Sequence, residues 1–254
     1  MMERKRLWGA ALLAVTALLC ADPVQAGEPK EKLSKVCPVP PWITETKVAL
    51  PNVQRALQRE KQIKIVTIGS SSTMGSGGSG PEAAWPAQLS TYLAKKMQSV
   101  KITVVNKAEM RQSVPQMLAR FDRDVLAEKP SLVIWEAGTY EAARHADIDT
   151  LIADLQVGID RLMSNKIDVI MMDMQYARDT ARIINFQPYV DAMGRLGTTR
   201  DVFIFPRYDT MRGWVENEQI NFEATTRAEA MKTADTAYAC LGRLVAELIA
   251  TSLK

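Results

Sequence analysis

The stretch KIVTIGSSSTMGSGGSG, residues 64–80, has the pattern of a buried β-strand that changes abruptly into glycines and hydroxyl side chains. The apolar run Ile63–Ile68 is rich in β-branched residues, which favours a strand. Hydroxyl groups that follow such a strand are either turn and helix-capping groups or candidates for a nucleophile at the edge of a sheet. The residues concerned are Ser70, Ser71, Ser72 and Thr73, directly after Gly69.

Strand-like and helix-like segments alternate along the rest of the chain. Four further short apolar runs predict strands at Ile102–Val105, Leu132–Trp135, Ile167–Met172 and Val202–Phe205. Helical spacing is found in Trp85–Met97, Val114–Leu126, Ile148–Met163, Tyr189–Leu196 and, near the end, Tyr238–Ile249. Alternation of this kind requires right-handed crossovers and a parallel sheet. We therefore predict a three-layer α/β/α sandwich with a five-stranded parallel sheet, of the flavodoxin-like type.

The first 26 residues have the three parts of a secretory signal peptide. A basic MMERKR precedes the apolar LWGAALLAVTALL, and Val24-Gln25-Ala26 is a small-residue cleavage site. We expect cleavage after Ala26, a periplasmic or secreted protein, and no stable membrane insertion afterwards. An uncleaved anchor and a lipoprotein with Cys20 as its lipidated residue are the alternatives. Residues 27–62 are then an N-terminal arm and first helix, and residues 63–254 the main domain.

Charge and cysteine content narrow the function further. Residues 1–26 carry three basic and two acidic side chains, so their removal lowers the formal net charge from +3 to +2. So small an excess argues against nucleic acid as a partner. No Cys/His cluster suggests a metal, and Gly75, Gly77 and Gly80 lie too far after the strand to bind a dinucleotide, so we expect no cofactor. In an oxidising compartment Cys37 and Cys240 are candidates for a disulfide, the alternative being two buried thiols.

In parallel α/β sheets, ligands bind beyond the carboxyl ends of the strands, and several motifs fall there. Gly69-Ser70-Ser71-Ser72-Thr73 resembles the Gly-Asp-Ser-x-Thr block of the SGNH or GDSL hydrolase superfamily, which are secreted serine esterases on a flavodoxin-like fold. The resemblance extends over essentially the whole predicted mature domain. It implies that Ser71 is the nucleophile and that Ser70 replaces the aspartate.

The family's second and third blocks are present in altered form. Asn106 matches the asparagine of the second block, and Arg111 stands where the family has a glycine whose backbone N–H donates to the oxyanion. Gly138-Thr139-Tyr140-Glu141 is similar to Gly-x-Asn-Asp, with Tyr140 in place of the oxyanion-hole asparagine. The resemblance thus implies an oxyanion hole made of Ser71, Arg111 and Tyr140. Asp173-Met174-Gln175-Tyr176 after the fourth strand supports the same alignment.

The block that supplies the base is the most altered. In place of Asp-x-x-His the sequence has Glu229-Ala230-Met231-Lys232. Lysine is ordinarily protonated at neutral pH, so a Ser71–Lys232 dyad needs an environment that removes this charge, and Glu229 would oppose that. The single histidine, His145, is the other candidate base. Two hypotheses follow: an ester hydrolase or acyl-transfer enzyme acting on a small ester or an acylated glycan, or a catalytically inactive binding protein of the cell envelope.

Overall fold

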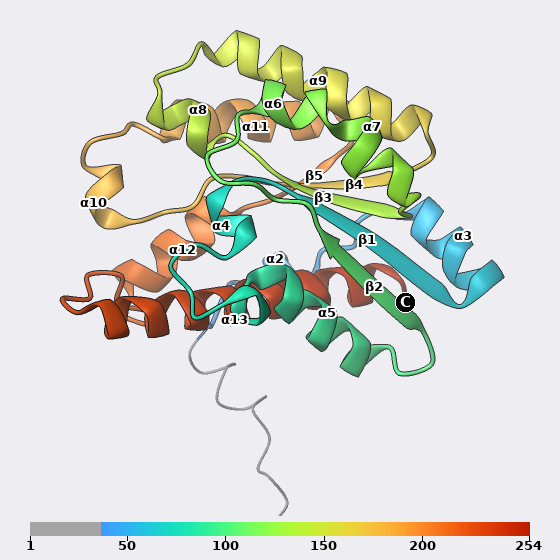
Figure 1. The fold of residues 1–254 in the computed structure, drawn as a ribbon, viewed down its shortest axis with the longest axis horizontal. Helices are drawn as coiled ribbons and strands as arrows, with labels where there is room; N and C mark the ends of the chain where they lie inside the picture. Colours follow the sequence, from blue (N-terminus) through green and yellow to red (C-terminus); the bar gives the residue numbers. More distant parts are fainter. Residues whose placement is uncertain (1–36) are drawn as a thin grey trace, which may run out of the picture.

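The computed structural model describes residues 37–254, which form one five-stranded sheet covered by helices (Figure 1). The strand order is β2-β1-β3-β4-β5, and every neighbouring pair is parallel. The strands are β1 (Gln62–Ile68), β2 (Lys101–Asn106), β3 (Leu132–Glu136), β4 (Asp168–Met172) and β5 (Phe203–Phe205). The predicted fold class is confirmed, and each predicted apolar run overlaps one of these strands.

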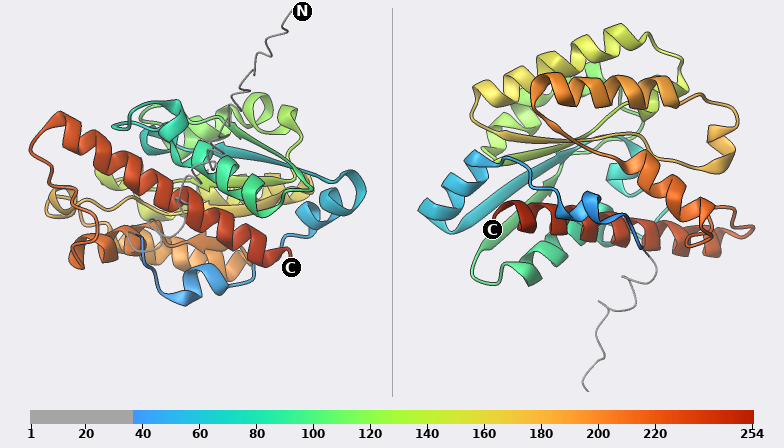
Figure 2. Two further views of the ribbon diagram at one scale, coloured as in Figure 1. Left: turned by 90° about the horizontal axis from the view of Figure 1, so that it is seen from below. Right: turned by 180° about the vertical axis from the view of Figure 1, so that it is seen from behind.

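Helices cover both faces of the sheet, as Figures 1 and 2 show. On one face lie α6 (Val114–Ala119), α9 (Ile148–Ser164) and α11 (Gln187–Arg200), and on the other α5 (Trp85–Lys96) and the long α13 (Arg227–Ser252). The backbones of α5 and α13 approach closely at Gly242, where a Cβ atom would lie 2.8 Å from the Trp85 carbonyl oxygen. This contact brings the last helix against the helix that follows the serine loop.

The segment before β1 is packed into the domain rather than separate from it. It contains α2 (Pro41–Glu45) and α3 (Pro51–Glu60), and Ile43, Leu50 and Val53 are buried in the core. Cys37 forms a disulfide with Cys240 of α13, which confirms the predicted pairing. The boundary at residue 63 stays a prediction. The predicted signal peptide lies outside the described residues, and in residues 37–254 no helix is long and apolar enough to cross a membrane.

Two helix predictions were wrong in extent. The segment predicted as one helix over Val114–Leu126 is divided into α6 and α7 (Phe121–Asp124), because Arg120 between them leaves the helical conformation at φ −111°. The last helix begins at Arg227 rather than Tyr238, because Thr226 and Glu229 form a capping box that starts it earlier. Short helices that were not predicted are α4 (Ser71–Met74), α8 (Thr139–Ala143), α10 (Arg178–Ala181) and α12 (Arg207–Glu216).

Candidate active site

The serine loop, Gly69–Gly80, starts at the carboxyl end of β1 and turns at once into α4. Ser70 is the N-cap residue of α4, and the side chains of Ser70, Ser72 and Thr73 are buried. Ser71, the first residue of the helix, is half-buried instead. Of these four consecutive hydroxyl residues, Ser71 is therefore the most accessible to a substrate.

Gly69 allows the loop to approach the end of β3. A Cβ atom at this position would lie 2.6 Å from Thr73 Oγ1 and 2.7 Å from Glu136 Oε2, closer than carbon atoms normally approach. The space that a side chain would fill is occupied by the carboxylate of Glu136, the last residue of β3. Glycine is thus required here to admit a buried carboxylate directly behind the serine loop.

The backbone of Arg111 contacts Ser71, and its role in the oxyanion hole stays a prediction. Its backbone N–H donates a hydrogen bond to Ser71 Oγ with a nitrogen–oxygen distance of 3.0 Å. The backbone of Arg111 has φ 55°, in the left-handed region that glycine adopts most readily. Arg111 thus adopts a backbone conformation that suits glycine, and its own side chain is exposed.

Glu141 joins the loop after β3 to the loop after β2. Its carboxylate accepts a hydrogen bond of 2.6 Å from the backbone N–H of Val114, the first residue of α6. Burial raises the pKa of Glu141, while this N–H bond opposes the rise. Tyr140 lies next to it in α8, half-buried, with its ring 5.1 Å from the guanidinium of Arg144. Within residues 37–254 no hydrogen bond joins Tyr140 to Ser71, so its role in the oxyanion hole stays a prediction.

Glu229 and Lys232 lie on the first turns of α13, residues 227–236, and both are exposed. The carboxylate of Glu229 accepts hydrogen bonds from the Thr226 hydroxyl at 2.9 Å and the Thr226 N–H at 3.3 Å, so it closes the capping box. In the described part of the chain neither side chain is hydrogen-bonded or ion-paired to Ser71. Their role as catalytic base stays a prediction.

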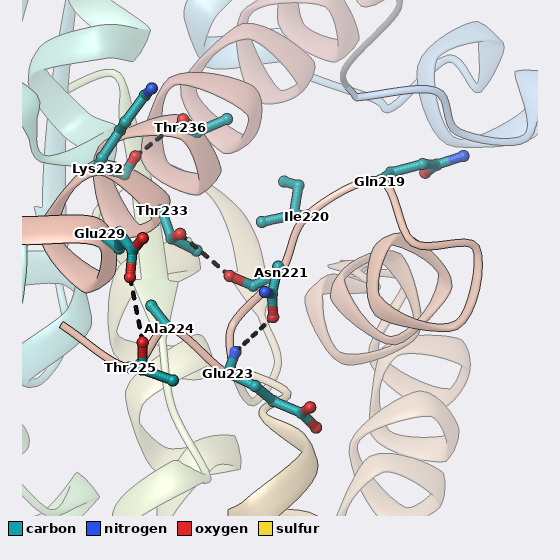
Figure 3. A pocket seen from close by; sticks show the side chains of 10 residues that line it. All are labelled: Gln219, Ile220, Asn221, Glu223, Ala224, Thr225, Glu229, Lys232, Thr233 and Thr236. Atoms are coloured by element: carbon teal, nitrogen blue, oxygen red, sulfur yellow. Dashed lines mark hydrogen bonds between the residues drawn. The ribbon is translucent and has the colours of Figure 1, made fainter.

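A polar cavity of about 510 Å³ lies between loop 219–225 and the first turns of α13 (Figure 3). Glu229 and Lys232 both line it, together with Asn221, Thr225 and Thr233, whereas Ser71 does not. The ammonium group of Lys232 extends away from the carboxylate of Glu229 (Figure 3). The two residues predicted to act as a pair are thus separated within the same cavity.

The single histidine of the sequence, His145, is exposed on the turn after α8. Its backbone adopts φ 52°, and its N–H donates to the carbonyl of Ala142. No side-chain hydrogen bond holds its imidazole in residues 37–254. An exposed imidazole without a partner on the serine loop has no fixed geometry from which to accept the Ser71 proton.

Two residues near Ser71, Glu136 and Arg207, were not predicted from the sequence. Glu136 is 1% exposed and accepts a hydrogen bond of 2.8 Å from the N–H of Ser70. Arg207, the first residue of α12, is completely buried and donates to Ser72 Oγ at 2.9 Å and to Gln175 Oε1 at 3.3 Å. A charged residue at the end of an apolar run, as in VIWE, was the one available signal for Glu136.

One more buried carboxylate, Asp173, follows β4. Its Oδ1 accepts a hydrogen bond of 2.8 Å from the N–H of Tyr208 in α12. Burial raises the pKa of Asp173 to about 8. As for metals, residues 37–254 contain no group of three or more His, Cys, Asp or Glu side chains that could hold an ion.

Comparison with known proteins agrees with this geometry. Among solved structures, a lipase/acylhydrolase from Enterococcus faecalis has a TM-score of 0.59 at 21% identity, covering 76% of this chain and 97% of its own. A mutant of Axe2, an acetyl-xylooligosaccharide esterase from Geobacillus, has a TM-score of 0.55 at 18% identity, covering 68% and 91%. At these identities the likeness shows the fold.

The sequence matches no curated protein. The profile of the Non-GDSL lipase-like family, however, matches residues 36–254. This match includes every residue of the serine loop and of α13, and together with the solved structures it confirms the resemblance drawn from the sequence. The chain belongs to the Non-GDSL lipase-like family, in the SGNH/GDSL hydrolase superfamily.

Proposed function

We propose that the protein is an exported serine ester hydrolase in which Ser71 attacks the acyl carbon of its substrate. The observation that carries this proposal is the 3.0 Å hydrogen bond from the N–H of Arg111 to Ser71 Oγ. During attack the carbonyl oxygen of an ester comes to lie beside the attacking oxygen. The N–H of Arg111 points at the attacking oxygen itself, so it lies within reach of the carbonyl oxygen beside that atom and can stabilise the negative charge that develops there.

In the proposed reaction the Ser71 oxygen bonds to the acyl carbon and the alcohol leaves, after which water releases the acid. The N–H groups of Ser71 and Arg111, with the hydroxyl of Tyr140, are the proposed oxyanion donors. Lys232 is the proposed acceptor of the Ser71 proton, with Glu229 on the same first turns of α13. Because Lys232 is exposed and Glu229 is engaged in the capping box, we expect weak turnover.

The disulfide between Cys37 and Cys240 supports export, because such bonds persist in oxidising compartments. We propose that residues 1–26 are the cleaved signal peptide and that the mature protein is periplasmic or secreted. The arm 27–62 and the domain 63–254 would then fold together, since Cys37 is bonded to the last helix.

For the substrate we propose a short acyl ester, in particular an acylated glycan of the cell envelope. The Geobacillus enzyme that shares the fold is an acetyl-xylooligosaccharide esterase. The cavity beside α13 is lined by hydroxyl, amide and charged side chains, which suit the hydroxyl groups of a sugar. The amide of Asn221 and the ammonium of Lys232 are among the lining groups that could donate to such a ligand.

A second function, glycan binding without turnover, is favoured by one observation. The hydrogen bond from Arg111 is the only one that Ser71 Oγ makes in residues 37–254. A serine hydroxyl without a neighbouring base is a poor nucleophile. The same cavity and fold would then serve for binding alone.

The two functions are separated by covalent labelling and turnover. The protein, produced by export from its full-length precursor, would be assayed on short-chain aryl esters and reacted with a serine-reactive phosphonate, followed by mass spectrometry. Hydrolysis predicts a label on Ser71 that Ser71→Ala abolishes. Ser79→Ala is the matched control, because Ser79 is an exposed serine of the same loop. Wild type that neither turns over nor labels would reject the hydrolase and leave the binding function. Turnover that survives Ser71→Ala would reject Ser71 as the nucleophile and the binding function as well.

A further inference from the structure

Five hydrogen bonds join six residues around the serine loop into a ring that is closed by the backbone between Ser72 and Thr73. Thr73 Oγ1 donates to Glu136 Oε2 at 3.1 Å, and Thr139 Oγ1 donates to Glu136 Oε1 at 3.3 Å. The N–H of Gln175 donates to Thr139 Oγ1 at 3.4 Å. Arg207 donates to Gln175 Oε1 and to Ser72 Oγ. The ring thus links the segments that follow β1, β3, β4 and β5.

The negative side of the ring is Glu136. Its Oε2 accepts hydrogen bonds from two groups of the serine loop, the N–H of Ser70 and the hydroxyl of Thr73. The indole N–H of Trp85 donates to the same Thr73 hydroxyl at 3.3 Å. Because a buried carboxylate without donors is very unfavourable, these contacts fix both the carboxylate and the loop that surrounds it.

The positive side of the ring is Arg207. Its guanidinium is completely buried, and it donates to the hydroxyl of Ser72, which lies between Ser71 and Thr73. Its Nε has no hydrogen-bond partner among the described residues. No direct ion pair between Arg207 and Glu136 occurs in this part of the chain, and the two side chains contact different residues at α4, Glu136 bonding to Ser70 and Thr73 and Arg207 to Ser72.

Burying two charged side chains adds little net stability to a fold. Replacing buried charged residues with apolar ones of similar volume is often neutral or stabilising, because desolvation offsets the attraction. We therefore infer that the ring has a role other than stability. Its contacts converge on Ser70, Ser72 and Thr73, the three residues around Ser71.

We propose that Glu136 and Arg207 are positioning residues that hold α4 through different residues, so that Ser71 Oγ meets the N–H of Arg111. Neither side chain touches the substrate. The inference rests on the proposed function, because it assigns the ring to the alignment of Ser71 as nucleophile. It also explains why Gly69 has no side chain: the carboxylate of Glu136 occupies that space.

Glu136→Gln tests the proposal with almost unchanged shape. Its matched control is Asp168→Asn. Asp168 is also buried and accepts N–H bonds of 2.9 Å from Asn52 and Val53, but it lies at the amino end of β4, away from the carboxyl ends where the serine loop begins. We expect Glu136→Gln to lower the rate of phosphonate labelling at Ser71 by about 10²-fold, as a small misplacement of a reacting group does. We expect kcat to fall and KM to change less than twofold. Asp168→Asn should label at the wild-type rate.

A second readout is independent of catalysis. Amide hydrogen exchange of residues 69–76 should become faster in Glu136→Gln and stay unchanged in Asp168→Asn. Unchanged exchange and labelling in Glu136→Gln would overturn the positioning role. If wild type does not label while exchange still becomes faster in the variant, the hydrolase is rejected, the role of Glu136 in holding the loop stands, and its catalytic purpose is overturned.

Should Glu136→Gln fail to fold, Thr73 provides a gentler variant. Thr73→Val removes the hydroxyl that donates to Glu136 with little change of volume, whereas Thr73→Ser keeps it. We expect Thr73→Val to slow labelling by at least tenfold and Thr73→Ser to restore the wild-type rate to within about threefold. Equal rates in the valine and serine variants would show that the hydrogen bond to Glu136 does not position Ser71.

Discussion

The serine loop and the first turns of α13, which the family pattern predicts to supply nucleophile and base, are built in opposite ways. Ser70, Ser72 and Thr73 are buried and hydrogen-bonded to buried charges from two other elements. Glu229 and Lys232 are exposed, and Glu229 bonds within its own helix start. One segment is fixed by tertiary contacts, and the other is held by local capping.

This difference shows which half of the site depends on the fold. Moving the serine loop would expose or unpair buried polar groups, which costs much more than moving an exposed side chain. The base side can therefore change by substitution with little effect on folding, whereas the nucleophile side cannot. The predicted alignment agrees, since it keeps the serine of the family pattern and places Lys232 where the pattern has histidine.

The largest effect on stability is expected from the disulfide, which joins α13 at the point where its exposed first turns give way to its buried part. Cys240 lies just after the exposed first turns and is bonded to Cys37, 203 residues away in sequence. Replacing both cysteines with serine should lower the free energy of unfolding by about 5 kcal/mol, because the unfolded chain loses a long cross-link. Urea denaturation would measure this, with reduced wild type as the control. A loss below about 1 kcal/mol would show that packing, not the bond, holds this half of α13.

Arg111 offers a sharp pair of variants for the nucleophile side. Arg111→Val should lower kcat by about 10²–10³-fold, the usual effect of losing an oxyanion donor, because valine disfavours φ 55° and would displace the N–H. Arg111→Gly keeps the N–H and suits this backbone, so activity should be retained. Steady-state kinetics on an aryl ester would compare them. Equal activity of the two variants would mean that the N–H of Arg111 does not act in the reaction.

The parts of the site that depend on neighbouring residues in the sequence could be predicted, whereas the parts that depend on residues far apart in the sequence could not. The strand and serine loop were predictable because β-branched runs and the Gly-Ser-Ser-Ser-Thr pattern are local signals. The early start of α13 was also readable, since Thr226-x-x-Glu229 is a capping-box pattern, but the family alignment drew attention to Glu229 as a catalytic residue instead.

Arg207 could not be predicted from the sequence. Arginine is usually exposed, and the partners that satisfy this one, Ser72 and Gln175, are 135 and 32 residues away. Glu136 presents the same difficulty, because Ser70 comes near it only when β1 and β3 pair. Residues that support the site through long-range contacts therefore require the structure.

The buried carboxyl of Asp173 makes the stability of the folded protein depend on pH. Burial raises its pKa to about 8, whereas an aspartate in the unfolded chain titrates near pH 4. Between these values the folded state binds more protons, so stability should fall as pH rises, with a slope of at most about 1.4 kcal/mol per pH unit from this group. Asp173→Asn should remove this contribution in urea denaturation at pH 5 and pH 8. Asp179→Asn, at an exposed aspartate of α10, is the control. The same slope in both variants would contradict the assignment to Asp173.

The smallest effect is expected on the exposed side, at Glu229. If its carboxylate serves only the capping box, Glu229→Ala should lower the free energy of unfolding by about 1 kcal/mol and leave phosphonate labelling of Ser71 unchanged. Glu229→Gln is the matched control, because glutamine also completes a capping box. A base or its charged partner would behave differently, since removing general-base assistance costs about 10²–10⁴-fold in rate. A rate loss of that size in both variants would show that the first turns of α13 do reach Ser71 during the reaction, and the contrast between the two halves of the site would then hold only for the free protein.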